Sequence, residues 1–252
     1  MSRARDTADQ INRVNSSAAD ATAITVDSSE NVGIGNTSSG YIFSSGEKRL
    51  SVGDGTEHAG IQVLSGTNKW GGLEFADDTT NANAQGLIAY YHPDNYMQFN
   101  TNGSQSMRID LSGRVTTPSQ PSFLVRRNGD QTGYNPNNYA HSVIFNQEEY
   151  DIGNNVSTTT GLFTAPVNGV YIFFASAYST TNNFGQAWFT VNGGRGSASD
   201  FVKAAADAFV NCSVIFKLSA NDTVGYHPHG SGTSATIKAN ENHTWFKGHL
   251  IG

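Results

Sequence analysis

Segment 161–174 constrains the fold most, because its pattern indicates two strands joined by a tight turn. Tyr171 and Phe173 are two residues apart, so they lie on the same face of an extended strand. Pro166 ends the preceding strand, and Gly169 allows the chain to turn before the next strand begins. The segment therefore predicts paired strands with one apolar face.

Similar short apolar runs, separated by turn residues, fill the rest of the chain after residue 121. Further strands are expected at 143–145, 186–191, 210–218 and 244–251, with turns at Asn192–Gly193 and 220–222. The sequence holds 27 glycines, and charged residues make up only 14% of it, well below the usual quarter. This composition favours an all-β protein with many tight turns.

The first residues show a different pattern. Residues 1–20 carry alanines and an isoleucine at three- and four-residue spacing, which predicts a short helix; a disordered tail is the alternative. A helix this short is marginal alone in water, so it would need a partner. We expect residues 1–21 to anchor the chain to a larger particle.

Residues 22–117 form a second region, rich in short strands interrupted by glycine. Strands are expected around 50–52, 61–63 and 70–75. Strands at 87–91 and 96–99 flank His92-Pro-Asp-Asn95, which is a strong hairpin-turn signal. Because one chain would have difficulty closing a core from such strands, we expect intertwining with neighbouring chains in a shaft or collar.

A repeated pattern occurs in this region. Residues 24–32 can be laid over 107–115, sharing an apolar residue, Asp, any residue, Ser, two of any kind and Val. The pattern predicts a strand, an Asp-Ser turn and a second strand. The side chains of Asp27 and Asp110 are expected to accept hydrogen bonds from backbone N–H groups two residues on.

The boundary before the last region is predicted from proline. Pro118 and Pro121 favour an extended joint over residues 116–121. The last module then comprises residues 118–252, which is long enough to bury a sandwich core.

The net charge and the lengths of the apolar runs limit the classes of partner that the chain can have. The formal net charge of −6, without long Lys or Arg clusters, argues against nucleic acid as the main partner. No stretch approaches the roughly 18 apolar residues of a membrane span, and the N-terminus lacks a signal peptide's apolar core. We therefore expect synthesis in a host cytoplasm without membrane insertion.

Motifs for chemistry are scarce. Cys212 is the single cysteine and is expected to pack as a small apolar group on a strand. Two pairs of adjacent carboxylates occur, Glu148-Glu149 and Asp77-Asp78. A strand would point the two members of each pair to opposite faces, whereas the two catalytic carboxylates of a glycosidase face the same bond of the substrate. We expect no enzyme activity, no cofactor and no bound metal.

Two segments are candidate ligand-binding loops. One holds Tyr134, Asn137, Asn138 and Tyr139, whose rings and amides suit contact with sugar or protein. The other holds Tyr226, His227 and His229. Two histidines in each of three copies can hold a metal near a threefold axis, although an ordinary polar loop is the more favoured interpretation.

The last module resembles the globular head of the complement C1q and tumour necrosis factor superfamily. The resemblance covers about residues 118–252 and rests on blocks that occur in the family's order: Phe163, Thr164, Ala165, Pro166, Gly169, Tyr171 and Phe173; Tyr150 and Asp151; Val191, Asn192 and Gly193; Phe246, Gly248 and Leu250. It implies a ten-strand jelly roll that assembles as a homotrimer around a threefold axis.

Residues 22–117 resemble modules of phage tail fibres, on phrases that lie between residues 91 and 115, including the one at 107–115. Together the two resemblances imply a homotrimeric virion fibre protein. Its partners would be itself, other virion proteins through the N-terminus, and a host surface glycan or protein. Alternatives are a capsid decoration or head-fibre protein, a cellular C1q-like lectin or adhesion protein, and a glycan depolymerase.

Overall fold

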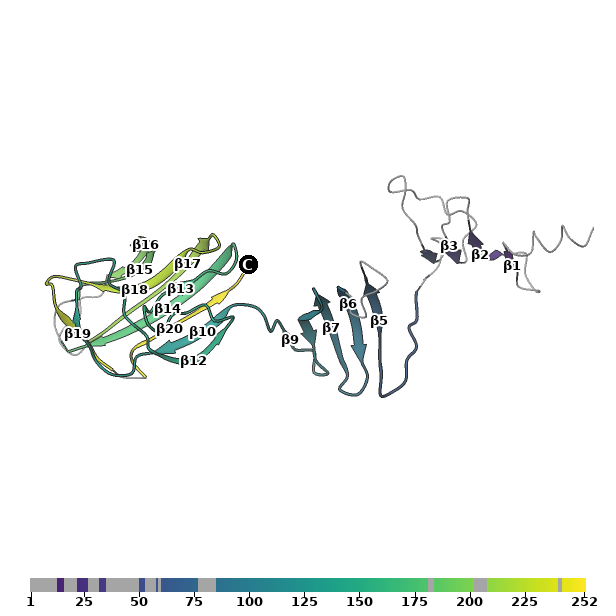
Figure 1. Ribbon diagram of the computed structural model, residues 1–252, viewed down its shortest axis with the longest axis horizontal. Helices are drawn as coiled ribbons and strands as arrows, with labels where there is room; N and C mark the ends of the chain where they lie inside the picture. Colours follow the sequence, from purple (N-terminus) through teal and green to yellow (C-terminus); the bar gives the residue numbers. More distant parts are fainter. Residues whose placement is uncertain are drawn as a thin grey trace, which may run out of the picture. The chain divides into compact units, whose positions relative to one another are not determined.

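The computed structural model describes residues 13–15, 22–26, 32–34, 50–52, 58, 60–76, 85–180, 184–201, 208–239 and 242–252. Every regular element in these ranges is a β-strand, which confirms the all-β prediction (Figure 1). None of the described residues forms a helix able to span a membrane. The chain divides into two compact units, 1–72 with 90–93, and 73–89 with 94–252. The module boundaries at residues 21 and 117 stay predictions.

The first four strands form a small sheet in the order β1-β2-β3-β4. They are β1 Arg13–Asn15, β2 Thr22–Val26, β3 Val32–Ile34 and β4 Leu50–Val52. The helix predicted over 1–20 is wrong at β1, which pairs antiparallel with β2. The strand forms there because pairing with β2 provides hydrogen bonds for the backbone, whereas an isolated short helix is only marginally stable. The rest of that prediction, and the turn at Asp27, lie outside the described residues.

A second sheet, here called the collar sheet, has the order β5-β6-β7-β8-β9. Its strands are β5 Trp70–Phe75, β6 Gly86–Tyr91, β7 Tyr96–Thr101, β8 Ser104–Ile109 and β9 Val115–Thr116. The hairpin predicted at residues 92–95 is confirmed. A strand predicted at 61–63 is wrong, because residues 61–66 carry no regular structure.

The Asp-Ser turn is also confirmed in its second copy. Asp110 Oδ1 accepts the backbone N–H of Ser112 at 2.9 Å and that of Arg114 at 3.0 Å. Asp110 Oδ2 accepts Arg114 Nε at 2.7 Å, so one side chain connects β8 to β9. These bonds to the charged form, the Arg114 backbone bond first, lower the pKa of Asp110.

The joint after β9 is a turn, which corrects the prediction of an extended segment. Gln120 N donates to Thr117 O at 3.1 Å, with Pro118 at the second turn position. Proline's fixed φ angle suits this position in a β-turn, so its presence here bends the chain.

The remaining strands form the head sandwich, residues 122–250. Its larger sheet has the order β11-β19-β14-β20-β10-β12, and β17 pairs with β14 along its length. These strands are β10 Ser122–Arg126, β11 Gln131–Tyr134, β12 Gln147–Ile152, β14 Gly169–Ser179, β17 Ala208–Leu218, β19 Ala235–Ile237 and β20 Trp245–Leu250. The smaller sheet, β13-β18-β15-β16, contains β13 Phe163–Thr164, β15 Gln186–Val191, β16 Gly194–Phe201 and β18 Thr223–His229.

This is the jelly-roll sandwich that the resemblance implied, with eleven strands in its described part where ten were expected. The strand predicted at 143–145 is not formed. Val143 and Phe145 are nevertheless fully buried, so the segment belongs to the core without being a strand. Side chains take the place of strand-to-strand backbone hydrogen bonds at Ile144. Gln131 Oε1 accepts a hydrogen bond from Ile144 N, and Arg127 donates one to Ile144 O.

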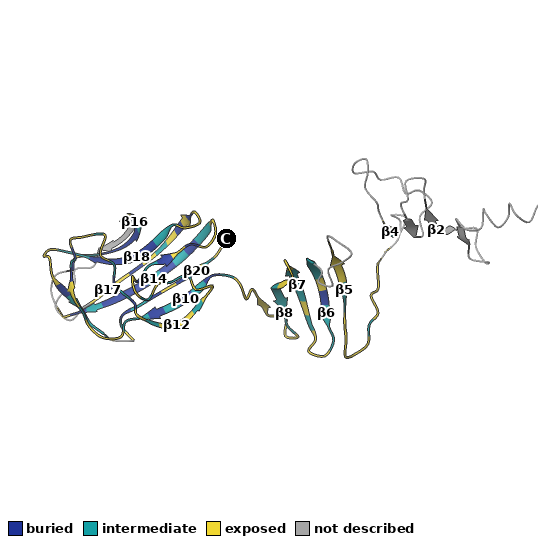
Figure 2. Ribbon diagram, in the orientation of Figure 1, coloured by how far each residue is buried: buried dark blue, intermediate teal, exposed yellow. Residues whose placement is uncertain are grey.

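The core between the two sheets is dominated by aromatic rings. Figure 2 shows the buried residues concentrated on the strands of the head. Tyr171 and Phe173 are both fully buried, which confirms that they share a face. Gly248 is required beside them, because a Cβ there would lie 2.6 Å from Phe173 and 2.7 Å from Phe123. Cys212 lies buried in the hydrophobic core on β17, as predicted.

Candidate binding surfaces

The two candidate loops meet in the fold, although only one of them is a loop. Tyr226, His227 and His229 lie on strand β18, which corrects their assignment to a loop. The strand forms because its residues pair with β15, Trp188 opposite His227 and Gln186 opposite His229. Tyr134 ends β11, which pairs with β19 at the end of the sandwich far from the C-terminus (Figure 1).

His227 is the buried centre of the cluster. The Tyr134 hydroxyl lies 2.7 Å from His227 Nδ1 and donates to Pro228 O at 3.0 Å. The carbonyl of His141 lies 2.6 Å from Nδ1, and that of Pro136 lies 3.2 Å from Nε2. Burial lowers the pKa of His227, and the two carbonyl contacts oppose this effect only in part. The contacts of the His227 ring therefore hold the segment 134–141 against β18.

Tyr139 closes the cluster from the solvent side. Its ring stacks on His229 at a centroid separation of 4.9 Å, and its hydroxyl lies 3.5 Å from His229 Nε2. It also meets the buried ring of Trp188 edge-on at 6.4 Å. The Arg195 guanidinium carbon lies 3.5 Å from the Trp188 ring centroid, a cation–π contact.

Trp188 and Arg195 were missed by sequence reasoning. The available signal was the alternation on 186–191, which places Trp188 on the face opposite Phe189 and hence outside the inter-sheet core. Arg195 follows the Asn192-Gly193 turn, where both residues have positive φ angles, as a tight two-residue hairpin requires.

The other candidate residues divide between surface and core. Asn137 and Asn138 are exposed, and the Asn138 side chain accepts Ala140 N at 3.1 Å, which fixes the turn. Tyr226 points the other way, into the core, where its hydroxyl donates to Val210 O. Tyr134 is buried as well, so burial raises its pKa. The exposed edge of the cluster is therefore formed by Asn137, Asn138, Tyr139 and His229.

A second surface lies on the outside of the larger sheet. The strand registers place Ile172 beside Ile215, Phe174 beside Lys247, and Tyr178 beside Phe209. We call this the outward face; its apolar members are Leu124, Tyr150, Ile152, Ile172, Phe174, Tyr178, Phe209 and Ile215.

Several of these side chains are largely unburied in the single chain. Ile215 is 59% exposed and Phe209 is 40% exposed. Lys247 Nζ lies 5.3 Å from the Phe174 ring and 4.9 Å from the Trp245 ring, so even its charged neighbour packs on aromatic surface. A contiguous exposed apolar face on a soluble domain marks an interaction surface.

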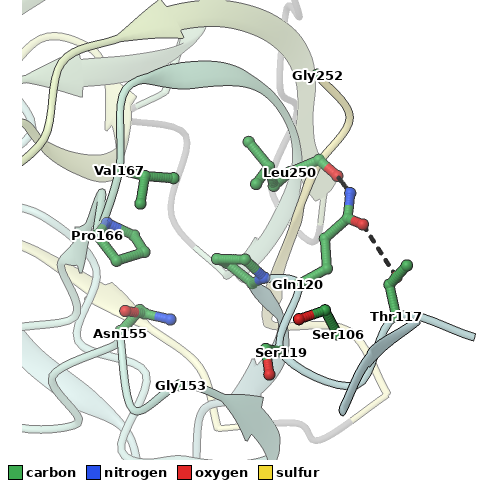
Figure 3. A pocket seen from close by; sticks show the side chains of 11 residues that line it. Ser106, Thr117, Ser119, Gln120, Gly153, Asn155, Pro166, Val167, Leu250 and Gly252 are labelled. Atoms are coloured by element: carbon green, nitrogen blue, oxygen red, sulfur yellow. Dashed lines mark hydrogen bonds between the residues drawn. The ribbon is translucent and has the colours of Figure 1, made fainter. Parts of the chain in front are cut away.

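A pocket of about 460 Å³ lies beside the C-terminus (Figure 3). Pro166, Val167 and Leu250 supply its apolar wall. Gln120 spans one side, accepting from Thr117 Oγ1 at 2.9 Å and donating to Leu250 O. None of the lining side chains is charged.

The acidic, histidine and cysteine side chains are the candidates for metal ligands or carboxylate pairs. In the part of the chain that the structure describes, the His, Cys, Asp and Glu residues form no cluster suited to a metal ion. Glu148 and Glu149 are exposed on β12, and Glu149 accepts Arg126 Nε at 2.9 Å. Asp77 and Asp78 lie outside the described residues.

Comparison with known proteins matches one family model, described as the C1q domain, to residues 122–251. No curated protein sequence matches the chain.

Several solved structures are similar. The globular domain of zebrafish complement 1qA protein shows 24% identity and a TM-score of 0.39, covering 53% of this chain and 98% of that one. Murine APRIL shows 11% identity and a TM-score of 0.39, covering 52% and 99%. The Eiger TNF of S. frugiperda shows 10% identity and a TM-score of 0.39, covering 53% and 94%.

Proposed function

This chain belongs to the C1q domain family, and we propose that it is a homotrimeric binding protein that presents its head sandwich to a ligand without catalysing a reaction. The outward face carries this proposal. Ile215 is exposed in the single chain, and Ile172 and Phe174 on the same face are only partly buried. Burying this face against two other copies would remove apolar area from water, at roughly 25 cal/mol per Å².

The ligand-binding end of the head is proposed to be the exposed edge of the aromatic cluster. Tyr139 and His229 form a stacked pair, with Asn137 and Asn138 beside them. Flat rings with neighbouring amides suit a sugar or a polar protein surface, because the rings stack while the amides hydrogen-bond. The contacts of His227 with the segment 134–141 hold this edge in one conformation, which lowers the conformational entropy lost on binding.

The finer proposal is a phage fibre protein of the virion, which binds the host cell surface. It is supported by the resemblance of residues 91–115 to fibre modules, and by the strand-turn-strand at Asp110, the form expected of that phrase. The N-terminal residues would then attach to other virion proteins. Three heads on each fibre would raise avidity by roughly 10²–10⁴ over one site.

The first test is the mass of the full-length protein by light scattering. A trimer of three 26.9 kDa chains, about 81 kDa, is expected. Ile215→Asp should shift the mass toward the monomer, because it places a charge in the proposed interface. Val167→Asp is the matched control, since Val167 is exposed and apolar but lies outside the outward face. A monomeric wild type would overturn the proposal.

Ligand binding is tested separately on the trimer. Tyr139→Ala with Asn138→Ala should abolish adsorption of the purified protein to host cells while the mass stays trimeric. Glu148→Ala, on the distant exposed strand β12, should leave adsorption unchanged. Equal adsorption by all three proteins would remove the cluster from the binding site.

A second candidate function is a cellular C1q-like lectin or adhesion protein. The family match favours it equally, because that match covers residues 122–251 and does not extend to the collar sheet. Antibody labelling of purified particles distinguishes the two: label on virions supports the fibre, and label confined to cell surfaces supports the adhesion protein.

A further inference from the structure

The collar sheet has one apolar face, which the register of its last three strands defines. Met97 is paired with Ile109, and Ile109 is paired with Val115, in one row across β7, β8 and β9. Phe99 is paired with Met107 in the next row. Because alternate residues of a strand share a face, these five side chains form one surface, here called the collar apolar face.

The opposite face of the same strands is polar. Gln98, Arg108 and Thr116 form the row behind Met97, Ile109 and Val115. The Arg108 guanidinium carbon lies 3.7 Å from the Tyr96 ring centroid, which covers that ring on the polar side. Within β7–β9, only one side of the sheet therefore lacks the environment that its side chains favour.

The collar apolar face is poorly covered in the single chain. Val115 is 60% exposed and Met97 is 37% exposed, while Phe99, Met107 and Ile109 are only half-buried. Among the described residues, the sheet contains β5–β9 and no further strand. A sheet needs a second layer over its apolar face to form a core, so something outside these strands must supply that layer.

We propose that the collar apolar face is a second self-association surface, which packs against the same face of two other copies of this chain. The absence of charge on this face supports a second copy of the chain as the partner that covers it. The face carries no charged side chain, so identical copies meet there without repulsion despite a net charge of −6 per chain.

Chain connectivity supports the same occupant. Residues 117–121 are all that separates β9 from β10, so a trimeric head holds three collar sheets at high effective concentration. The inference thus rests on the proposed trimer and extends it to a second surface.

Cross-linking of full-length variants, each with one introduced cysteine, tests the inference. Met97→Cys places a thiol on the collar apolar face, and Gln98→Cys places one on the polar face one residue away. Val115→Cys and Thr116→Cys form a second matched pair on β9. The native Cys212 is buried in the head and does not interfere. A disulfide requires Cα atoms within about 7 Å, so it reports direct contact between copies.

Mild oxidation should convert most of the Met97→Cys and Val115→Cys proteins to disulfide-linked dimers, in a proportion that does not depend on protein concentration. The two controls should stay below about a tenth of that yield. A trimer in which the thiols introduced by Met97→Cys and Val115→Cys stay unlinked and react freely with a maleimide would overturn the inference and leave the proposed function standing. Protection from maleimide without cross-linking would show another segment on the face, which also overturns it. A monomer would remove both proposals.

Discussion

The head sandwich and the collar sheet use the same kind of alternating strand, yet only the head builds a core within one chain. In the head, Phe173 and Phe246 are fully buried between two sheets. In the described part of the collar, Ala89 is the only hydrophobic residue that is fully buried, and the larger apolar side chains stay half-exposed. Alternation therefore specifies a face, but a core requires a second layer, and the head alone encodes both layers.

The largest expected effect is on the head core. Phe173 lies 5.3 Å from Phe163, 5.9 Å from Phe246 and 6.1 Å from Phe189, by ring centroids. Phe173→Ala should lower the head's free energy of unfolding by about 3–5 kcal/mol, because it opens a cavity. Guanidinium titrations followed by near-UV circular dichroism measure this loss.

The matched collar variant is Phe99→Ala, whose half-buried ring should cost the chain only about 1 kcal/mol. Its effect on unfolding should depend on protein concentration, as that of Phe173→Ala should not. Equal and concentration-independent losses from both variants would mean that the collar has a complete core of its own.

Glycine should show the same contrast with a smaller effect. Gly248→Ala should cost about 1–3 kcal/mol, because its Cβ would overlap Phe173 and Phe123 in a packed core. Gly103→Ala meets no atom within 4 Å in the collar and should cost about 1 kcal/mol, through its φ angle of +71° alone. Substituting D-alanine by chemical ligation at Gly103 should restore stability, whereas at Gly248 neither enantiomer should be tolerated.

The sequence predicted the strands of the head well because they follow period-two alternation closed by local turns. Tyr171 with Phe173 and the Asn192-Gly193 hairpin depend on neighbouring residues only, so they could be located from the chain alone. Residues 143–145 show the limit of this approach. A strand was predicted there from the apolar alternation, but side chains from other segments, among them Gln131, replace its backbone pairing.

The candidate cluster was predicted only in part. Tyr134, Tyr139, His227 and His229 meet as two far-apart segments, which no local pattern could establish. The strand at 226–229 was missed because Pro228 and the two histidines look like a turn, whereas pairing with β15 determines its structure. Trp188 enters the cluster for the same reason, through its cross-strand position opposite His227.

The pH dependence should distinguish the two regions, since His227 is buried in the head and no titratable group of the described collar is fully buried. Burial lowers the pKa of His227, so the unfolded chain takes up a proton first as the pH falls below about 6.5. The head should therefore lose stability between pH 7 and pH 5, by at most about 1.4 kcal/mol per pH unit. Unfolding titrations across this range measure the slope.

His227→Gln should flatten that slope, because an amide does not titrate there. Replacement of the exposed His58, which lies outside the head, by Gln is the control and should leave the slope unchanged. If the His227→Gln protein keeps the wild-type slope, another group controls the acid response, and His141 and His229 beside the ring are the next to be replaced.

The smallest effect is expected at two partly buried aspartates that cap turns, one in each region. Asp110 holds Ser112 N and Arg114 N in the collar, and Asp222 Oδ2 accepts Ser219 N at 2.8 Å in the head. Asp110→Ala should raise hydrogen exchange throughout the short strand β9, because little else holds it in the single chain. Asp222→Ala should raise exchange only at Ser219 and at Thr223, since β18 stays paired with β15 along its length. Thr223 is affected because its N–H is held by the Asn192 side chain that Asp222 orients.

Lowering the pH should reproduce the effect of Asp110→Ala on hydrogen exchange in β9. Hydrogen bonds from Arg114 lower the pKa of Asp110, so its contribution is present at neutral pH and lost as the pH falls through that lowered value. Exchange confined to the turn in both variants would mean that β9 is already held by a second layer. Combining Asp110→Ala with Met97→Cys, before and after oxidation, separates these cases: if copies of the chain supply that layer, the disulfide should return β9 to slow exchange.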